Sequence, residues 1–92
     1  MIRTFADTET ERIFRGETSR RLPQEIQRTA HRKLQQLDSI SHVDELRVPP
    51  GNRLHLLSGN RAGQWAISVN DQYRICFRWE DDAYEVEITD YH

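Results

Sequence analysis

The chain has 92 residues, of which 36% are hydrophobic and 30% charged. This length predicts one domain over residues 1–92, with one modest core and a shallow working surface. The single cysteine, Cys76, excludes an internal disulfide and suits a reducing cytosol. No apolar run approaches the ~20 residues of a membrane span. The N-terminus also lacks the apolar core of a secretion signal. We therefore expect a cytoplasmic protein without membrane contacts.

The net charge of −2 conceals an uneven distribution along the chain. Residues 1–46 are balanced, with eight basic and eight acidic side chains. Residues 47–78 carry five arginines against one aspartate, whereas residues 79–92 carry six acids and no lysine or arginine. A basic central block suits a polyanionic partner such as a nucleic acid. On composition alone, a solvated surface of mixed charge is the favoured explanation, because the whole chain is not basic.

The N-terminal half predicts a short strand followed by two helices. Residues 2–5 alternate in polarity, as in a strand. Asp7 or Thr8 can cap a short helix that Gly16 would end. Pro23 suits the first turn of a second helix, which should end near residues 38–41. The second helix has one apolar stripe, formed by Ile26, Ala30, Leu34 and Leu37.

The C-terminal half changes from helical to alternating periodicity. The run Pro49-Pro50-Gly51-Asn52 marks a hard turn. Four candidate strands follow, at residues 54–57, 64–69, 73–79 and 84–90. Their short connections predict an antiparallel meander. The expected fold class is therefore α+β in the order β-α-α-β-β-β-β. Two N-terminal helices should cover one face of a curved, mainly antiparallel sheet and leave the other face open.

Matching apolar residues across the hairpins fixes an expected register. Val69 should pair with Tyr73, leaving the three-residue loop 70–72. The last hairpin should place Ile75 opposite Ile88, Phe77 opposite Val86 and Trp79 opposite Tyr84. This register puts a polar set on the uncovered face, namely Gln64, Ser68, Arg74, Arg78, Glu85, Glu87 and Thr89.

Several side chains could carry chemistry. Arg74 lies at mid-sheet between Ser68 and Thr89, where its guanidinium could grip a phosphate, unless it simply pairs with Glu87. His55 lies in the first strand after the Pro-Pro turn and is either structural or a proton carrier. The terminal Asp90-Tyr91-His92 is either a frayed end or a proton-handling group. Arg78 can form a plain ion pair with Glu85. The histidines show no metal-ligand spacing, so no metal site is expected.

Taken in order, these segments resemble the HigB branch of the RelE/ParE toxin superfamily. The resemblance covers nearly the whole chain. It starts at Met1-Ile2-Arg3-Thr4-Phe5 and includes the helical residues 32–38. Its main segments are Pro49-Pro50-Gly51-Asn52-Arg53-Leu54, residues 57–64, residues 67–79 and Val86-Glu87-Ile88-Thr89-Asp90-Tyr91-His92.

The resemblance implies a RelE-like fold and a toxin of a toxin–antitoxin operon, neutralised by a HigA-type helix-turn-helix antitoxin. Such toxins cut messenger RNA in the ribosomal decoding site without metal or cofactor. The 2′-hydroxyl attacks the adjacent phosphate and leaves a cyclic phosphate and a 5′-hydroxyl. The matching positions are Arg74 as phosphate clamp, Asp90 to orient or activate a histidine, and Tyr91 to bind or stack on RNA. His55 and His92 are the acid and base candidates, and the sequence does not say which of the two is the base. The arginines expected to bind RNA are Arg53, Arg61 and Arg78.

Ser58 stands where some relatives have a lysine, so this chain would lack one positive charge at that turn. Two other functions fit the same fold. One is a gyrase poison of the ParE kind, which does not require His55 or the terminal Asp90-Tyr91-His92. The other is a weakened toxin that acts mainly as co-repressor and contacts operator DNA only through its antitoxin.

Overall fold

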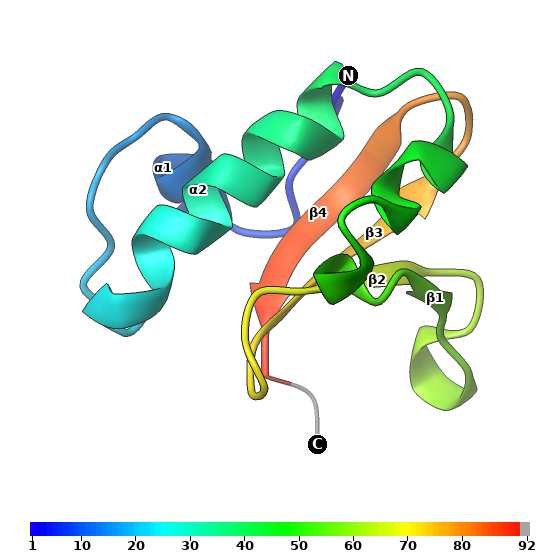
Figure 1. The fold of residues 1–92 in the computed structure, drawn as a ribbon. Coiled ribbons are helices and arrows are strands. Elements are labelled where there is room, and N and C mark those ends of the chain that lie inside the picture. The colour runs from blue at the N-terminus through cyan, green and yellow to red at the C-terminus, as the bar shows by residue number, and fades with distance from the viewer. Residues whose placement is uncertain (91–92) are drawn as a thin grey trace.

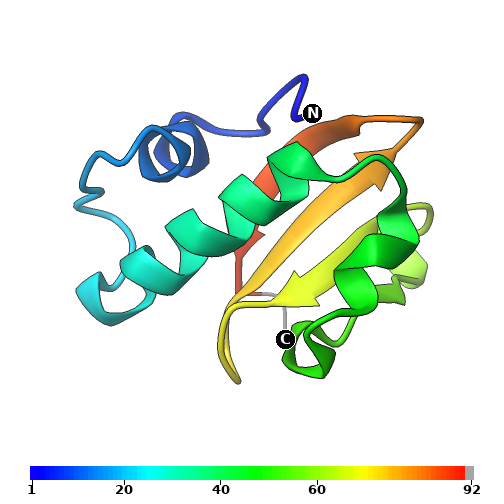
Figure 2. The same ribbon diagram turned by 45° about the horizontal axis from the view of Figure 1, so that its top comes forward.

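A computed structural model describes residues 1–90. Two helices, α1 (Thr8–Phe14) and α2 (Gln24–Ser39), precede four strands. The strands are β1 (His55–Leu56), β2 (Trp65–Ser68), β3 (Arg74–Trp79) and β4 (Ala83–Thr89), and they form one antiparallel sheet in the order β1-β2-β3-β4. The helices lie together on one side of the sheet (Figures 1 and 2). The α+β fold expected from the sequence is confirmed.

Helix α1 begins and ends where the local sequence predicts. Asp7 caps α1, because its Oδ1 accepts a hydrogen bond from the Thr10 amide at 2.6 Å. Gly16, at φ +82°, takes the left-handed conformation that follows a helix end. The apolar stripe predicted for α2 is buried as a whole: Ile26, Ala30, Leu34 and Leu37.

The core fills the space between α2 and one face of the sheet (Figure 2). The largest fully buried side chain of the sheet is Phe77, and Ile67, Ile75 and Val86 are also inaccessible to solvent. Burying each such side chain contributes about 1.5–3 kcal/mol. The sheet is therefore packed against α2 through these side chains.

The prediction of a regular strand at residues 2–5 is wrong. Residues 2–5 make only two isolated parallel bridges to β4, Ile2 with Ala83 and Phe5 with Val86. Asp82 fixes this segment, because its carboxylate pairs with the N-terminal ammonium at 3.0 Å and with Arg3 at 2.8 Å. Hydrogen bonds and charge from Arg3 and the N-terminus lower the pKa of Asp82. The segment thus protects the edge of β4 without becoming a regular strand.

In the last hairpin, the expected register holds at the end far from the β3–β4 turn and fails next to that turn. Ile75 pairs with Ile88 as predicted, but Trp79 pairs with Ala83 instead of Tyr84. The pairing of Phe77 with Val86 falls in a bulge, where Glu85 adopts φ +53°. The extra residue lets Ala83 and Val86 both reach the core, so burial of a small side chain overrides the simple alternation.

The segment that leads into β1 contains two 3-10 helices, Val43–Arg47 and Pro50–Asn52. The sequence predicted a turn at residues 49–52 but neither of these helices. Asn52 is fully buried and donates to the Leu46 carbonyl at 3.1 Å. Gln36 of α2 donates to the Val48 carbonyl at 2.8 Å. These contacts fix the start of β1 relative to α2. None of the helices in the described part of the chain has the length and apolarity needed to cross a membrane.

Candidate active face

The strand register brings His55 and Arg74 to the same side of the sheet. His55 pairs with Ala66, Ala66 with Cys76, and Cys76 with Glu87. The next row is Ser68, Arg74 and Thr89. Directly paired residues point to the same face, and residues two apart along a strand share that face. Both rows lie on the face opposite the core, which we call the reverse face.

His55 is exposed on the short edge strand β1. Its Nδ1 lies 2.7 Å from the carbonyl oxygen of Arg53, a residue in the left-handed conformation at φ 50°. A carbonyl oxygen can only accept a hydrogen bond, so Nδ1 is the protonated nitrogen and Nε2 of the neutral ring carries the lone pair. The local backbone therefore selects the tautomer that can accept a proton at Nε2.

Arg74 is half-buried and is anchored to the turn between β2 and β3. Its Nη1 donates to the carbonyl oxygens of Asn70 at 2.5 Å and Tyr73 at 3.1 Å. Asn70 in turn fixes this turn, because its Oδ1 accepts from the amides of Gln72 and Tyr73. Within residues 1–90, no carboxylate forms an ion pair with Arg74. Its Nε and Nη2 keep three N–H donors for an anion.

The alternative pairing of Arg74 with Glu87 is wrong, because Glu87 pairs with Arg61 at 3.2 Å. From strand spacing, the Cα atoms of His55 and Arg74 lie about 12 Å apart, two strands across and two residues along. Two side chains of this length can reach a common group from that separation. The register therefore allows the imidazole and the guanidinium to act on one phosphodiester.

Asp90 follows β4 and is exposed. Gln72 of the β2–β3 turn donates from Nε2 to Asp90 Oδ2 at 2.7 Å, so Asp90 lies beside the turn that anchors Arg74. The other two predicted members of the terminal triplet, Tyr91 and His92, lie outside the described residues.

The reverse face is more covered than the sequence predicted. Ala66 and Cys76 have no exposed surface although they point away from the helices. The turn after β1 carries Arg61, which pairs with Glu87 of β4 and donates to Gln64 at 3.1 Å. Since Glu87 is opposite Cys76, the Arg61 side chain extends over the middle of the sheet. Nothing in the sequence placed this turn above the face.

The remaining predicted RNA-binding arginines are exposed at the border of the face. Arg53 precedes β1, and Arg78 forms the ion pair with Glu85 at 2.8 Å that the sequence allowed. Exposed pairs of this kind are weak and exchange readily for another anion. Residues 1–90 contain no group of three His, Cys, Asp or Glu side chains arranged to hold a metal ion.

Cys76 gives the face a measurable pH dependence. Burial raises the pKa of its thiol from 9.0 to about 11, with Glu87 adding to the rise and Arg61 and Arg74 opposing it. Below pH 9 the thiol is protonated in both the folded and the unfolded chain. As the pH rises from 9.0 to about 11, it ionises only in the unfolded chain. We therefore expect the free energy of unfolding to fall as the pH rises across that range.

The measurement is urea unfolding of the wild-type chain and Cys76→Ala at a series of alkaline pH values. The free energy of unfolding should fall more steeply with pH in the wild type. Lys33, whose pKa burial lowers, is present in both proteins and cancels in the difference. Parallel pH curves would contradict a buried, neutral thiol.

Comparison with known proteins places the chain in a family. A family model described as the RelE-like toxin of the type II toxin–antitoxin system HigB matches residues 3–92. The chain belongs to this HigB-like toxin family. Toxin HigB-1 of Vibrio cholerae is 41% identical over 78 residues, covering 84% of this chain and 82% of the relative. Endoribonuclease HigB of Proteus vulgaris is 35% identical over 94 aligned positions, covering 100% of both chains.

An uncharacterised protein of Haemophilus influenzae is 29% identical over 89 residues, covering 96% of this chain and 88% of the relative. As a member of a type II toxin–antitoxin family, this HigB-like toxin has an antitoxin partner. The resemblance to HigB toxins inferred from the sequence is confirmed.

Proposed function

We propose that this HigB-like toxin is an endoribonuclease that cuts messenger RNA on the ribosome with its reverse face. The carrying observation is that the sheet register presents His55 and Arg74 on one side while the helices occupy the other. The relative from Proteus vulgaris, matched along its whole length, bears the name Endoribonuclease HigB.

The proposed reaction is an internal transfer at phosphorus. His55 Nε2 takes the proton of the RNA 2′-hydroxyl, whose oxygen forms a bond to the adjacent phosphorus. The bond from phosphorus to the 5′-oxygen breaks, and a general acid gives that oxygen a proton. The products are a 2′,3′-cyclic phosphate and a 5′-hydroxyl. Arg74 stabilises the added charge on the non-bridging oxygens through its remaining donors.

The other predicted residues take supporting roles in this proposal. His92 is the general acid, Asp90 orients a histidine, and Tyr91 stacks on a base. Arg53 and Arg78 contact RNA phosphates at the border of the face. Arg61 shapes the face through its pair with Glu87.

The acidic C-terminal block is compatible with RNA binding because much of its charge is paired. Asp82 pairs with Arg3 and the N-terminal ammonium, Glu85 with Arg78, and Glu87 with Arg61. The negative charge that the sequence places on residues 79–92 is therefore partly neutralised at the sheet.

The partners follow from the proposed site and the family. We propose a HigA-type helix-turn-helix antitoxin, with operator DNA contacted only through it. Messenger RNA in the small-subunit decoding site is the proposed substrate, and the cytoplasm is the compartment in which the two meet.

Mapping 5′ ends of cellular messenger RNA after induction of the toxin tests this function. We expect new 5′-hydroxyl ends inside translated reading frames, which disappear when initiation of translation is blocked. Induction of Arg74→Ala should give none. Accumulation of gyrase–DNA cleavage complexes without new RNA ends would instead identify a gyrase poison.

A further inference from the structure

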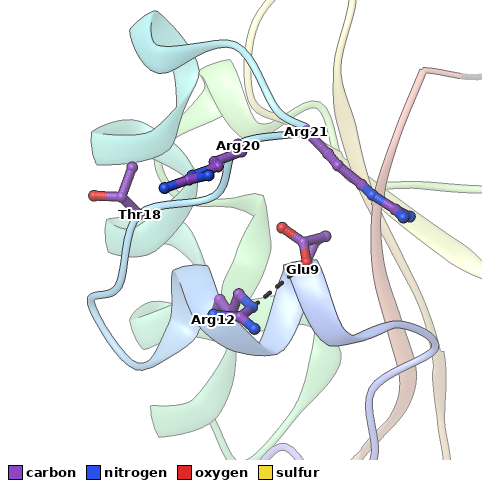
Figure 3. Close-up of a pocket in the computed structure, with 5 residues that line it drawn as sticks. All are labelled: Glu9, Arg12, Thr18, Arg20 and Arg21. Atoms are coloured by element: carbon purple, nitrogen blue, oxygen red, sulfur yellow. Dashed lines mark ion pairs between the residues drawn. The ribbon is translucent and has the colours of Figure 1, made fainter.

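A second polar site lies outside the reverse face, at the loop between α1 and α2. A pocket of about 390 Å³ is lined by Glu9 and Arg12 of α1 and by Thr18, Arg20 and Arg21 of the loop. Three of its five lining side chains are arginines. Figure 3 shows Arg20 and Arg21 extending from the loop in different directions, with Glu9 and Arg12 below them on α1. The net positive charge of the pocket lining therefore favours an anion.

The loop that carries these arginines is held in one conformation by Ser19, which is 1% exposed. The Ser19 hydroxyl donates to Glu9 Oε1 at 2.6 Å and accepts from the amides of Arg21 and Leu22. Gln27 of α2 donates to the carbonyl oxygens of Ser19 and Leu22, both at 2.8 Å. The backbone beside both arginines is thus ordered before any ligand arrives, which lowers the entropy cost of binding.

The negative charge in the pocket is already engaged. Glu9 accepts from Ser19 and pairs with Arg12 at 3.5 Å, and Glu17 pairs with Arg12 at 3.7 Å. Among the described residues, no carboxylate pairs with Arg20 or Arg21. Arg20 and Arg21 therefore have their guanidinium N–H donors available for an anion.

Helix α1, which lines the pocket, also contacts the C-terminal part of β4. Thr10, adjacent to Glu9, accepts a hydrogen bond from the Ile88 amide at 2.9 Å. Ile88 is followed by Thr89, the cross-strand partner of Arg74. At this end of the sheet, β4 therefore lies between β3, which carries Arg74, and α1, which lines the pocket. A chain that crosses the reverse face past Arg74 can continue around β4 to the pocket.

We propose that this pocket is a second RNA site, which binds backbone phosphates of a single strand through Arg20 and Arg21. The guanidinium fork matches phosphate oxygens with two parallel hydrogen bonds. Two forks that extend in different directions fit successive phosphates of one strand better than one small anion. The inference rests on the proposed function, since it extends the path of the same RNA, but it makes no use of the cleavage chemistry.

The test is binding of a short, single-stranded 2′-O-methyl RNA, which cannot be cleaved, measured by fluorescence anisotropy over a series of salt concentrations. Arg20→Ala with Arg21→Ala should bind at least about tenfold more weakly. The slope of log K against log salt should be smaller in magnitude by about 1.4, as expected for two lost phosphate contacts. The midpoint of thermal unfolding should be unchanged, because both side chains are exposed.

The matched control is Arg15→Ala with Arg47→Ala. It removes the same net charge from exposed arginines that pair with Glu11 and Asp44. This control should keep the wild-type salt slope. Equal weakening in both double variants would overturn the site, since net charge alone would then account for the effect. Wild-type binding by the Arg20 and Arg21 double variant would also overturn it.

A third arm offers oligoglutamate in place of RNA. Tighter binding of that peptide than of RNA through Arg20 and Arg21 would assign the pocket to an acidic protein partner and reject the RNA assignment. Failure of the proposed function has a different signature. The wild type would then leave messenger RNA uncut in cells, while the anisotropy assay would still report whether the pocket holds RNA.

Discussion

Arg74→Ala should lower the rate of RNA cleavage about 10²–10³-fold while the protein stays folded. The guanidinium is the only cation of the Ser68–Arg74–Thr89 row, and it faces the position proposed for the phosphate. Its Nη1 is held by two backbone carbonyls, so the remaining donors are oriented before the substrate binds. Alanine removes both the charge and the donors. The assay is single-turnover cleavage of messenger RNA on programmed ribosomes with the purified toxin.

Arg74→Lys separates the charge from the shape of the group. Lysine keeps the positive charge but cannot reproduce two parallel hydrogen bonds, so its rate should lie between those of the wild type and Arg74→Ala. A rate for Arg74→Ala within a few-fold of the wild type would remove this arginine from the mechanism. Loss of the folded state in that variant, seen by circular dichroism, would indicate a structural role instead.

His55→Ala should reduce the same rate about 10²–10⁴-fold, the usual contribution of a positioned acid or base. The Arg53 carbonyl accepts from His55 Nδ1, so Nε2 is the nitrogen that takes the 2′-hydroxyl proton in the proposed reaction. His55 is exposed on an edge strand, and its removal leaves no cavity in the core. The thermal midpoint should therefore stay close to that of the wild type.

His31→Gln is the matched control for His55. The Nδ1 of His31 also contacts a backbone carbonyl, that of Ile13 at 2.8 Å, but it lies between the two helices. We expect a cleavage rate near that of the wild type for this variant. Equal losses of activity in His31→Gln and His55→Ala would mean that cleavage depends on the fold and not on the reverse face.

The sequence predicted the elements that depend on local periodicity. The apolar stripe of α2 and the pairing of Ile75 with Ile88 depend on simple repeats, and both are found in the structure. The bulge at Glu85 was not predictable in this way. It arises because Ala83 can replace a larger residue opposite Trp79, a choice that depends on how the N-terminal segment packs against β4.

The candidate site was predictable only where it depends on strand alternation. The side shared by Ser68, Arg74 and Thr89 follows from strand alternation alone. The position of Arg61 over Cys76 does not, because a turn after a two-residue strand has no periodicity to read. The pocket at Arg20 and Arg21 was missed for a different reason. Residues 1–46 are balanced in charge, and only the contacts of Glu9 and Arg12 show which arginines stay unpaired.

Amide chemical shifts of the ¹⁵N-labelled toxin during titration with a 2′-O-methyl RNA test the central claim most directly. If the reverse face holds the RNA strand, the largest changes should fall on His55 in β1 and on Ser68, Arg74 and Thr89 farther across the sheet. Changes confined to the outer side of α2, with these four amides unmoved, would contradict it.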